Sequence, residues 1–155
     1  MLVFGFSALL LGLAVAVWCN YFYGMVFTST TLIVVTPSAE LADQVADAVA
    51  EQTAELPRRE EVERALANYG AVVVVADLAT GVELVNRLAP EHVELHVRDP
   101  WCVHEQVLNA GAVFLGEAST EPVGDYFAGT NHVLPTNGAA RYASSLGLSD
   151  FVKTT

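Results

Sequence analysis

Basic residues are scarce in this sequence, and their scarcity excludes one large class of partners. Seven Lys and Arg residues stand against 18 Asp and Glu residues, which gives a formal net charge of −11 at pH 7. The single lysine is Lys153, close to the end of the chain. Because nucleic-acid binding requires a basic face that neutralises phosphates, the composition argues against DNA or RNA as a partner.

Cysteine is rarer still, with only Cys19 and Cys102. Two cysteines are too few for a disulfide framework or a structural zinc site, so each is expected to be a plain thiol that is buried or faces a membrane. The sequence also lacks the Gly-x-Gly-x-x-Gly dinucleotide fingerprint, the phosphate-binding P-loop and the Gly-x-Ser-x-Gly motif of hydrolases. It therefore offers no candidate cofactor-binding residue.

Charge is missing altogether from residues 1–27, and the first charged residue is Glu40. As a helix, this stretch would be about 40 Å long, more than the roughly 30 Å core of a bilayer. It lacks the basic start and the cleavage site of a signal peptide. Residues 1–30 are interpreted either as a transmembrane helix or as the product of a wrongly started reading frame, ahead of an α/β domain at 31–155.

Beyond residue 30, short β-branched runs alternate with amphipathic stretches. Strands are predicted at TLIVVT (31–36), AVVVVADL (71–78), HVELHV (92–97) and AVFLG (112–116). Helices are predicted between them, with Thr36 and Asp99 as N-caps, over residues 36–56, 57–70, 79–90 and 99–111. This alternation predicts a Rossmann-like α/β domain, in which helices cover both faces of a parallel sheet.

After Gly116 the regular pattern ends, and roughly 35 residues of loop-like sequence follow. Their centre is GDYFAGTNHVLPTNG (124–138), which contains Asp125 and His132 and has the period of neither a helix nor a strand. Loops of this length inside a compact domain are usually functional or disordered, and the aromatic and apolar residues here argue against disorder. A functional loop is therefore expected.

Glu91 and His92 directly follow Pro90 at the mouth of a predicted strand. Such a pair could perform acid–base catalysis, because His titrates near neutral pH and burial can raise the pKa of Glu. The alternative is structural, with Glu91 as a solvated turn residue and His92 bonded to the backbone. Asp125 is similarly open to two interpretations, since it could bind a metal or cap a turn.

Two further histidines are expected to have no catalytic role. His92 and His96 would lie about 13 Å apart along a strand, too far to share one metal ion. His96 is interpreted as a surface or packing residue. The same holds for His104, which lies among polar neighbours in a predicted amphipathic helix.

Four motifs in the sequence identify a family that it resembles. They are NRLAPEHVEL, NAGAVFLGE, GDYFAGTNHVLPT and LGLSDFVKTT. In this order they resemble histidinol dehydrogenase, over about residues 31–155. The resemblance implies an NAD- and zinc-dependent oxidoreductase that oxidises L-histidinol to L-histidine, the end of histidine biosynthesis. It also implies a cytoplasmic homodimer.

The same resemblance implies roles for the polar residues. Glu91 and His92 match the catalytic acid–base pair of the family, in which His92 accepts the hydroxyl proton of the substrate and Glu91 activates water at the aldehyde stage. Asp125 matches a zinc ligand, and the zinc holds the substrate. His132 matches a substrate-binding histidine, so His92, Asp125 and His132 together are expected to contact histidinol.

The sequence also departs from the family pattern. The family has further zinc ligands, a Gln and a His in an AQAEH-like helix before the first strand, and residues 1–30 contain neither Gln nor His. Its last ligand is a His beyond the point matched by Thr155, and its NAD-binding region lies upstream of residue 31. Asp125 alone could not hold catalytic zinc, which needs about three protein ligands.

Two functions are consistent with these observations. The first is a histidinol dehydrogenase fragment that is inactive by itself. The alternative is a membrane-anchored, non-catalytic α/β binding module, which is motivated by the uncharged residues 1–27. The presence of Glu91, His92, Asp125 and His132 together favours the first function.

Overall fold

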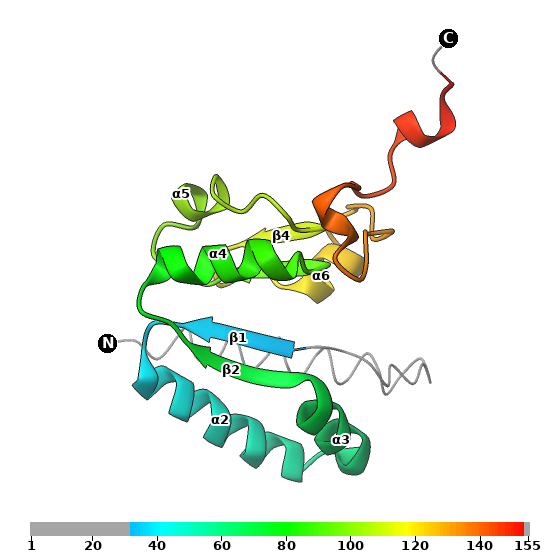
Figure 1. Cartoon of the computed structure of the whole chain (residues 1–155). Coiled ribbons are helices and arrows are strands. Elements are labelled where there is room, and N and C mark those ends of the chain that lie inside the picture. Colours follow the sequence, from blue (N-terminus) through cyan, green and yellow to red (C-terminus); the bar gives the residue numbers. More distant parts are fainter. Residues whose placement is uncertain (1–31, 154–155) are drawn as a thin grey trace. The chain divides into compact units, whose positions relative to one another are not determined.

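The computed structural model describes residues 32–153 (Figure 1). In chain order, its elements are β1 (Leu32–Thr36), α2 (Ala39–Ala54), α3 (Arg59–Tyr69), β2 (Gly70–Val74), α4 (Leu78–Leu88), β3 (His92–Leu95), α5 (Pro100–His104), β4 (Ala112–Leu115), α6 (Glu121–Tyr126), and the 3-10 helices η1 (Ala139–Arg141) and η2 (Leu148–Phe151). The transmembrane helix predicted for residues 1–27, and Cys19 within it, lie outside the described residues. Among the described residues, no helix has the length and apolarity needed to span a bilayer.

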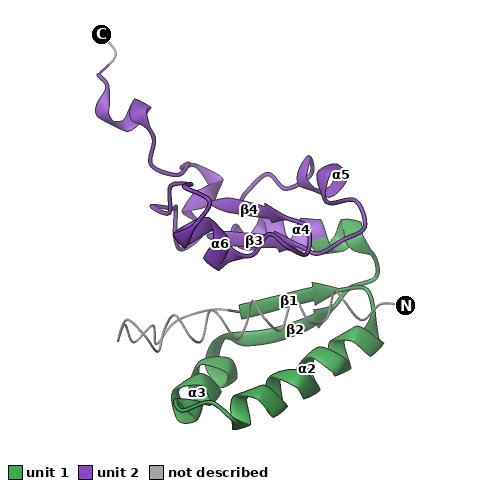
Figure 2. Cartoon of the chain, turned by 180° about the vertical axis from the view of Figure 1, so that it is seen from behind, with its two compact units in different colours: residues 1–81 green, residues 82–155 purple. Residues whose placement is uncertain are grey.

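The chain divides into two compact units, residues 1–81 and residues 82–155 (Figure 2). In the first unit, β1 and β2 pair in parallel, from Leu32 opposite Gly70 to Thr36 opposite Val74. Helices α2 and α3 form the connection between these strands, as the alternating pattern predicts. Gly70 follows the last residue of α3, and its N–H group bonds to the Leu66 carbonyl, so the predicted helix stop is confirmed.

Helix α2 begins later than the sequence predicts. Ser38, not Thr36, is its N-cap, and the Ser38 hydroxyl accepts a hydrogen bond from the N–H of Leu41. Thr36 is instead the last residue of β1, and its hydroxyl accepts from the N–H of Ser38 at 3.1 Å. Pro37 thus lies between strand and helix, because Ser38 supplies the oxygen that satisfies the first turn.

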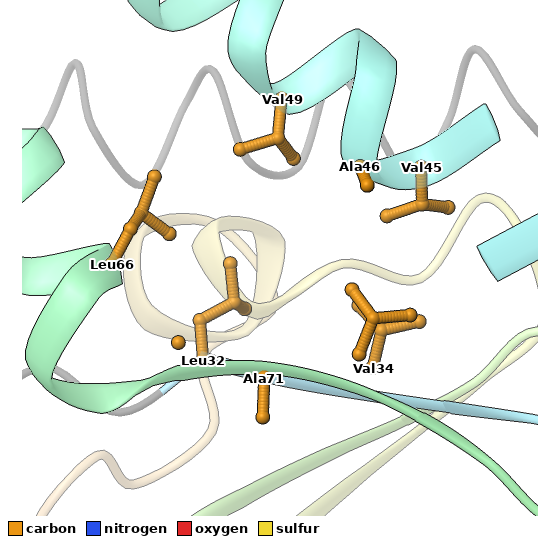
Figure 3. A pocket seen from close by; sticks show the side chains of 9 residues that line it. Leu32, Val34, Val45, Ala46, Val49, Leu66 and Ala71 are labelled. Carbon is orange, nitrogen blue, oxygen red and sulfur yellow. The ribbon is translucent and has the colours of Figure 1, made fainter. Parts of the chain in front are cut away.

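The described residues of the first unit pack around an apolar pocket. The inner face of α2 buries Val45 to 2% exposure, together with Ala42 and Ala48. An open apolar pocket of about 230 Å³ remains between α2, α3 and the strands. Figure 3 shows its lining side chains, among them Leu32, Val34, Val49 and Leu66.

In the second unit, β3 and β4 form another parallel pair, from His92 opposite Ala112 to Leu95 opposite Leu115. Its core is a cluster of four buried side chains, Val82, Val93, Leu95 and Val103. Val93 and Leu95 alternate with His92 and Glu94 along β3. Because successive side chains point to opposite faces of a strand, one face of β3 packs on the core while the other carries ionisable groups.

The predicted parallel pairing is confirmed, but the predicted single sheet is not. Within residues 32–153 the four strands form two separate two-stranded sheets, β1 with β2 and β3 with β4. Strand periodicity identifies the segments that become strands, but it does not specify which strands become neighbours. The structure is therefore an α/β fold with two small parallel sheets.

Helix α5 is shorter than predicted. Asp99 caps it and Pro100 is its first residue, as predicted, but the helix ends at His104. After it, the N–H groups of Gln106 and Val107 bond to the carbonyls three residues before them. The side-chain oxygen of Asn86 in α4 accepts the N–H groups of Leu108 and Asn109 at 2.7 and 3.2 Å. These amides are thereby withdrawn from helical hydrogen bonding.

Cys102 is exposed, so the prediction that it is buried is wrong. In α5 the buried residue is its neighbour Val103, which packs into the core cluster. A short helix with one inward-facing residue presents adjacent side chains to the outside.

Candidate active site

The first half of the candidate site is the start of β3. Helix α4 ends at Leu88, and Ala89, fully buried, adopts a φ of 50°, the left-handed conformation that commonly follows a helix. The chain then turns through Pro90 into Glu91, whose carbonyl accepts the N–H of Ala112 at 2.8 Å. This bond aligns β3 with β4 and places Glu91 and His92 at the beginning of β3, as the sequence predicts. The sequence did not indicate which side chains would lie opposite them.

The second half of the site is α6, which replaces part of the predicted loop. Residues 121–126 are helical, so the interpretation of residues 124–138 as neither helix nor strand is wrong for 124–126, whereas residues 127–138 are irregular as predicted. Pro122 lies in the first turn, where proline favours helix initiation. Glu121 and Asp125 are four residues apart, which places them on the same face of the helix. The predicted loop thus contributes an ordered helical face that carries two carboxylates.

His92, Glu121 and Asp125 come together at this point. Nε2 of His92 lies 4.0 Å from Oδ1 of Asp125, and both side chains are about one quarter exposed, at 27% and 25%. One ligand atom from each of the three residues lies within 4.8 Å of the others. Nε2 of His92 is buried and has no hydrogen-bond partner among residues 32–153, which leaves it available to a bound ion or substrate.

The carboxylates of the site disfavour one another's charge. Burial raises the pKa of Glu121 to about 7, and the carboxylates of Asp125, Glu94 and Glu91 add to the rise. Such a cluster of acids around one histidine nitrogen suits a cation, because a cation would remove the repulsion.

Glu94 lies beside this cluster and remains ionised more readily. Burial raises its pKa, but hydrogen bonds from His96 and from the N–H of Glu121 outweigh burial and hold the pKa below its ordinary value. His96 therefore packs against Glu94 at 2.8 Å, in agreement with its predicted packing role. His96 is not part of the cluster of His92, Glu121 and Asp125. This agrees with the prediction that His92 and His96 lie too far apart to share a metal ion.

The ring of Phe114 supports His92 from β4. The two rings stack with centroids 6.0 Å apart and an interplanar angle of 29°. Phe114 also lies against Gly124 of α6, where an added Cβ would come within 2.4 Å of the ring. Gly124 thus allows α6 to approach Phe114 closely.

Gly124→Ala is expected to destabilise the chain by about 1–3 kcal/mol, because the new methyl group overlaps the ring of Phe114. The free energy of unfolding in urea measures the effect. Gly147→Ala is the matched control, since an added Cβ there meets no atom closer than 3.7 Å. Equal stabilities of the two variants would contradict the expected overlap.

The structure does not bring every predicted residue into the cluster. Glu91 is half-buried and acts on it through charge, as its effect on Glu121 indicates. His132 is exposed on the segment after α6 and is not among the three clustered residues. This segment is tied to α6 by the Thr130 hydroxyl, which donates to the Gly124 carbonyl at 3.0 Å.

Two residues of the site were missed by the sequence analysis, Glu121 and Glu94. The sequence did contain a signal for Glu121. The run Thr-Glu-Pro (120–122) is typical of a helix start, and Asp125 follows Glu121 by four residues. Glu94 carried no such signal. Its part in the site depends on α6 lying next to β3.

The raised pKa of Glu121 predicts a dependence of stability on pH. Its folded pKa of about 7 exceeds the ordinary 4.5, so the folded state binds the proton more tightly and stability falls as pH rises from about 4.5 to 7. For this half-buried side chain, we expect a loss of about 1–2 kcal/mol after allowance for solvent screening.

In metal-free buffer with chelator, the Glu121→Gln variant should not show this loss of stability as pH rises. Above pH 7 it should therefore be more stable than the unaltered chain. Urea unfolding at pH 5 and pH 8 measures the difference. Glu117→Gln, which changes an exposed acid in the same unit, is the control. If Glu121→Gln and the unaltered chain lose equal stability between pH 5 and pH 8, the pKa of Glu121 is not raised in the folded state.

Comparison with known proteins identifies the family. Residues 28–155 match the sequence model of the family described as histidinol dehydrogenase. The chain is 56% identical over 121 residues to histidinol dehydrogenase of Thermosynechococcus vestitus, and 53% identical over 121 residues to that of Gloeobacter violaceus, in each case over 78% of this chain. It spans 28% and 27% of the lengths of these relatives.

A solved structure agrees with this result. The crystal structure of histidinol dehydrogenase from Elizabethkingia anophelis superposes with a TM-score of 0.75 at 35% sequence identity, over 79% of this chain and 28% of that one. The predicted resemblance is therefore confirmed by sequence and by structure. Since the family model matches far more than half of the residues, the chain belongs to the histidinol dehydrogenase family.

Proposed function

We propose that residues 32–153 form part of the active site of a histidinol dehydrogenase, which oxidises L-histidinol to L-histidine in two NAD⁺-dependent steps. The observation that carries the proposal is the buried Nε2 of His92, which has no hydrogen-bond partner in the described part of the chain and lies beside Asp125 where β3 meets α6. The proposal applies to the enzyme as a whole, of which these residues correspond to 28% in the relatives.

His92 and Glu91 have the proton-transfer roles in this proposal. In the first step the carbinol carbon gives a hydride to NAD⁺, and Nε2 of His92 accepts the hydroxyl proton, which yields the aldehyde. In the second step Glu91 would accept a proton from the water that adds to the aldehyde, and protonated His92 would return its proton to the aldehyde oxygen to give the hydrate. His92 would then accept a hydroxyl proton of the hydrate as its hydride passes to a second NAD⁺, which leaves the carboxylic acid. Stacking on Phe114 keeps the His92 ring in place.

The residues present fit a zinc ion. Asp125 would hold the ion, with Glu121 within reach of it, and His92 must keep Nε2 free if it is to accept a proton. When bound, zinc would supply a positive charge that binds the substrate and relieves the repulsion among the carboxylates. The family resemblance assigns the remaining ligands to sequence outside the matched segment, since catalytic zinc takes about three protein ligands.

The remaining parts of the proposal come from the family resemblance. His132 would contact histidinol from the exposed segment after α6, once substrate is bound. The enzyme would be a cytoplasmic homodimer. No observation on the described residues favours the membrane-anchored binding module.

A chimera tests the proposed function. Residues 32–153 would replace the matching segment of the histidinol dehydrogenase of Thermosynechococcus vestitus, and NADH formation from L-histidinol would be measured with zinc present. Activity within about tenfold of the parent enzyme is the expected result. A folded, zinc-loaded chimera without activity would reject the proposal.

A further inference from the structure

We propose that Glu94 is a positioning residue, which fixes α6 on β3 and thereby sets the separation of Asp125 from His92. The effect of Glu94 on catalysis rests on the proposed function, but the contacts that Glu94 makes do not. Nothing in the sequence analysis assigned a role to Glu94.

The two oxygens of Glu94 bond to two different partners. Oε1 accepts the backbone N–H of Glu121 at 2.8 Å, across 27 residues of chain. Oε2 lies 2.8 Å from Nε2 of His96. Because the ionised carboxylate only accepts hydrogen bonds, this second contact requires the proton on Nε2 of His96. Both side chains are largely shielded from water, at 24% and 16% exposure.

Helix α6 depends on this bond because it lacks an ordinary cap. The first N–H groups of a helix have no partner within it, and a side chain at the N-cap usually accepts one of them. The N-cap of α6 is Thr120, whose side chain makes no such bond. Glu94 satisfies the N–H of Glu121 from a neighbouring element, so the start of α6 is held by β3.

The same face of β3 carries both the anchor and the catalytic candidate. His92 and Glu94 are two residues apart and therefore point to the same side of the strand. Glu121 and Asp125 lie one turn apart on α6. The bond at one end of α6 consequently determines how far Asp125 lies from His92, and a displacement of about 1 Å in such a site can cost about 100-fold in rate.

The test uses the 155-residue chain and the variants Glu94→Ala and Glu94→Gln. Glutamine keeps a side-chain oxygen that can accept from Glu121, whereas alanine keeps none. Hydrogen exchange of the Glu121 amide, followed by NMR, is expected to accelerate at least tenfold in Glu94→Ala and about threefold or less in Glu94→Gln. Glu83 is an exposed acidic residue of α4, and Glu83→Ala should leave the exchange rate of the Glu121 amide unchanged.

An unchanged exchange rate of the Glu121 amide in Glu94→Ala would overturn the inference. Exchange accelerated equally in Glu94→Ala and Glu94→Gln would overturn it too. If Glu94→Ala does not fold, Glu94→Asp replaces it, because the shorter side chain retracts the carboxylate from α6. The acceleration is then expected in Glu94→Asp, and its absence has the same meaning.

Cobalt(II) titration of the chimera that carries the same substitutions separates this inference from the proposed function, because the chimera also contains the ligands outside the matched segment. We expect Glu94→Ala to weaken cobalt binding about tenfold or more and Glu94→Gln to restore most of it. If the unaltered chimera binds no cobalt but the Glu121 amide responds to Glu94, the metal role of Asp125 is rejected and the positioning role stands. If cobalt binds and the amide does not respond, the positioning role is rejected.

Discussion

His92→Gln is expected to lower kcat of the active chimera by about 10²–10⁴-fold, the range typical of the loss of a general base. Glutamine has similar reach but cannot accept and hold a proton. The buried, unpartnered Nε2 of His92 is the atom whose loss the experiment measures. Steady-state rates of NADH formation, over a range of pH, provide the measurement.

His104→Gln is the control for this variant. His104 is a half-buried histidine of the same unit, with a buried ring nitrogen of its own, but it is not part of the cluster with Asp125. Its replacement should leave kcat within about threefold. If His92→Gln retains most of the activity, or if both variants lose activity equally, His92 is not the base.

Asp125→Asn is expected to weaken zinc binding by at least about 100-fold, beyond the tenfold to 100-fold that supporting residues typically contribute. The amide has nearly the size of the carboxylate but lacks its charge, so α6 should keep its fold. The zinc content of the purified chimera and competition with a chelator measure the change. Activity should fall in proportion to the zinc lost.

Asp99→Asn makes the same chemical change away from the site. Asp99 caps α5 through the N–H of Cys102, a role that asparagine also performs well. This variant should bind zinc like the parent chimera. Full zinc occupancy in Asp125→Asn at low free zinc would exclude Asp125 as a ligand.

Local features of the fold could be predicted from the sequence. The β-branched runs became strands, Asp99 and Pro100 started a helix, and Gly70 followed the end of one. Each of these is determined by residues within a few positions, through side-chain spacing or backbone conformation. The irregular segment after α5 was not predictable, because its Leu108 amide bonds to Asn86, which lies 22 residues earlier.

The site was predicted unevenly for a related reason. Glu91, His92 and Asp125 were candidates because of their positions before a predicted strand and in a polar loop. Their roles, and that of His132, came from motifs of the family and not from contacts. Their mutual geometry depends on α6, and the glycine and aromatic residues around Asp125 obscured its helical spacing. Glu121 and Glu94 join the site through contacts between segments, which no local pattern in the sequence records.

The parallel pairing of both sheets determines the order in which the chain can fold. Residue 32 pairs with residue 70, and residue 92 with residue 112, so neither pair of strands can zip together from a tight turn. In the first unit, the chain must first be reversed through α2 and α3, and loop closure precedes any gain from strand hydrogen bonds. We therefore expect the ladder of β1 and β2 to form late in folding, at a rate that depends on how α2 and α3 bring the two strands together.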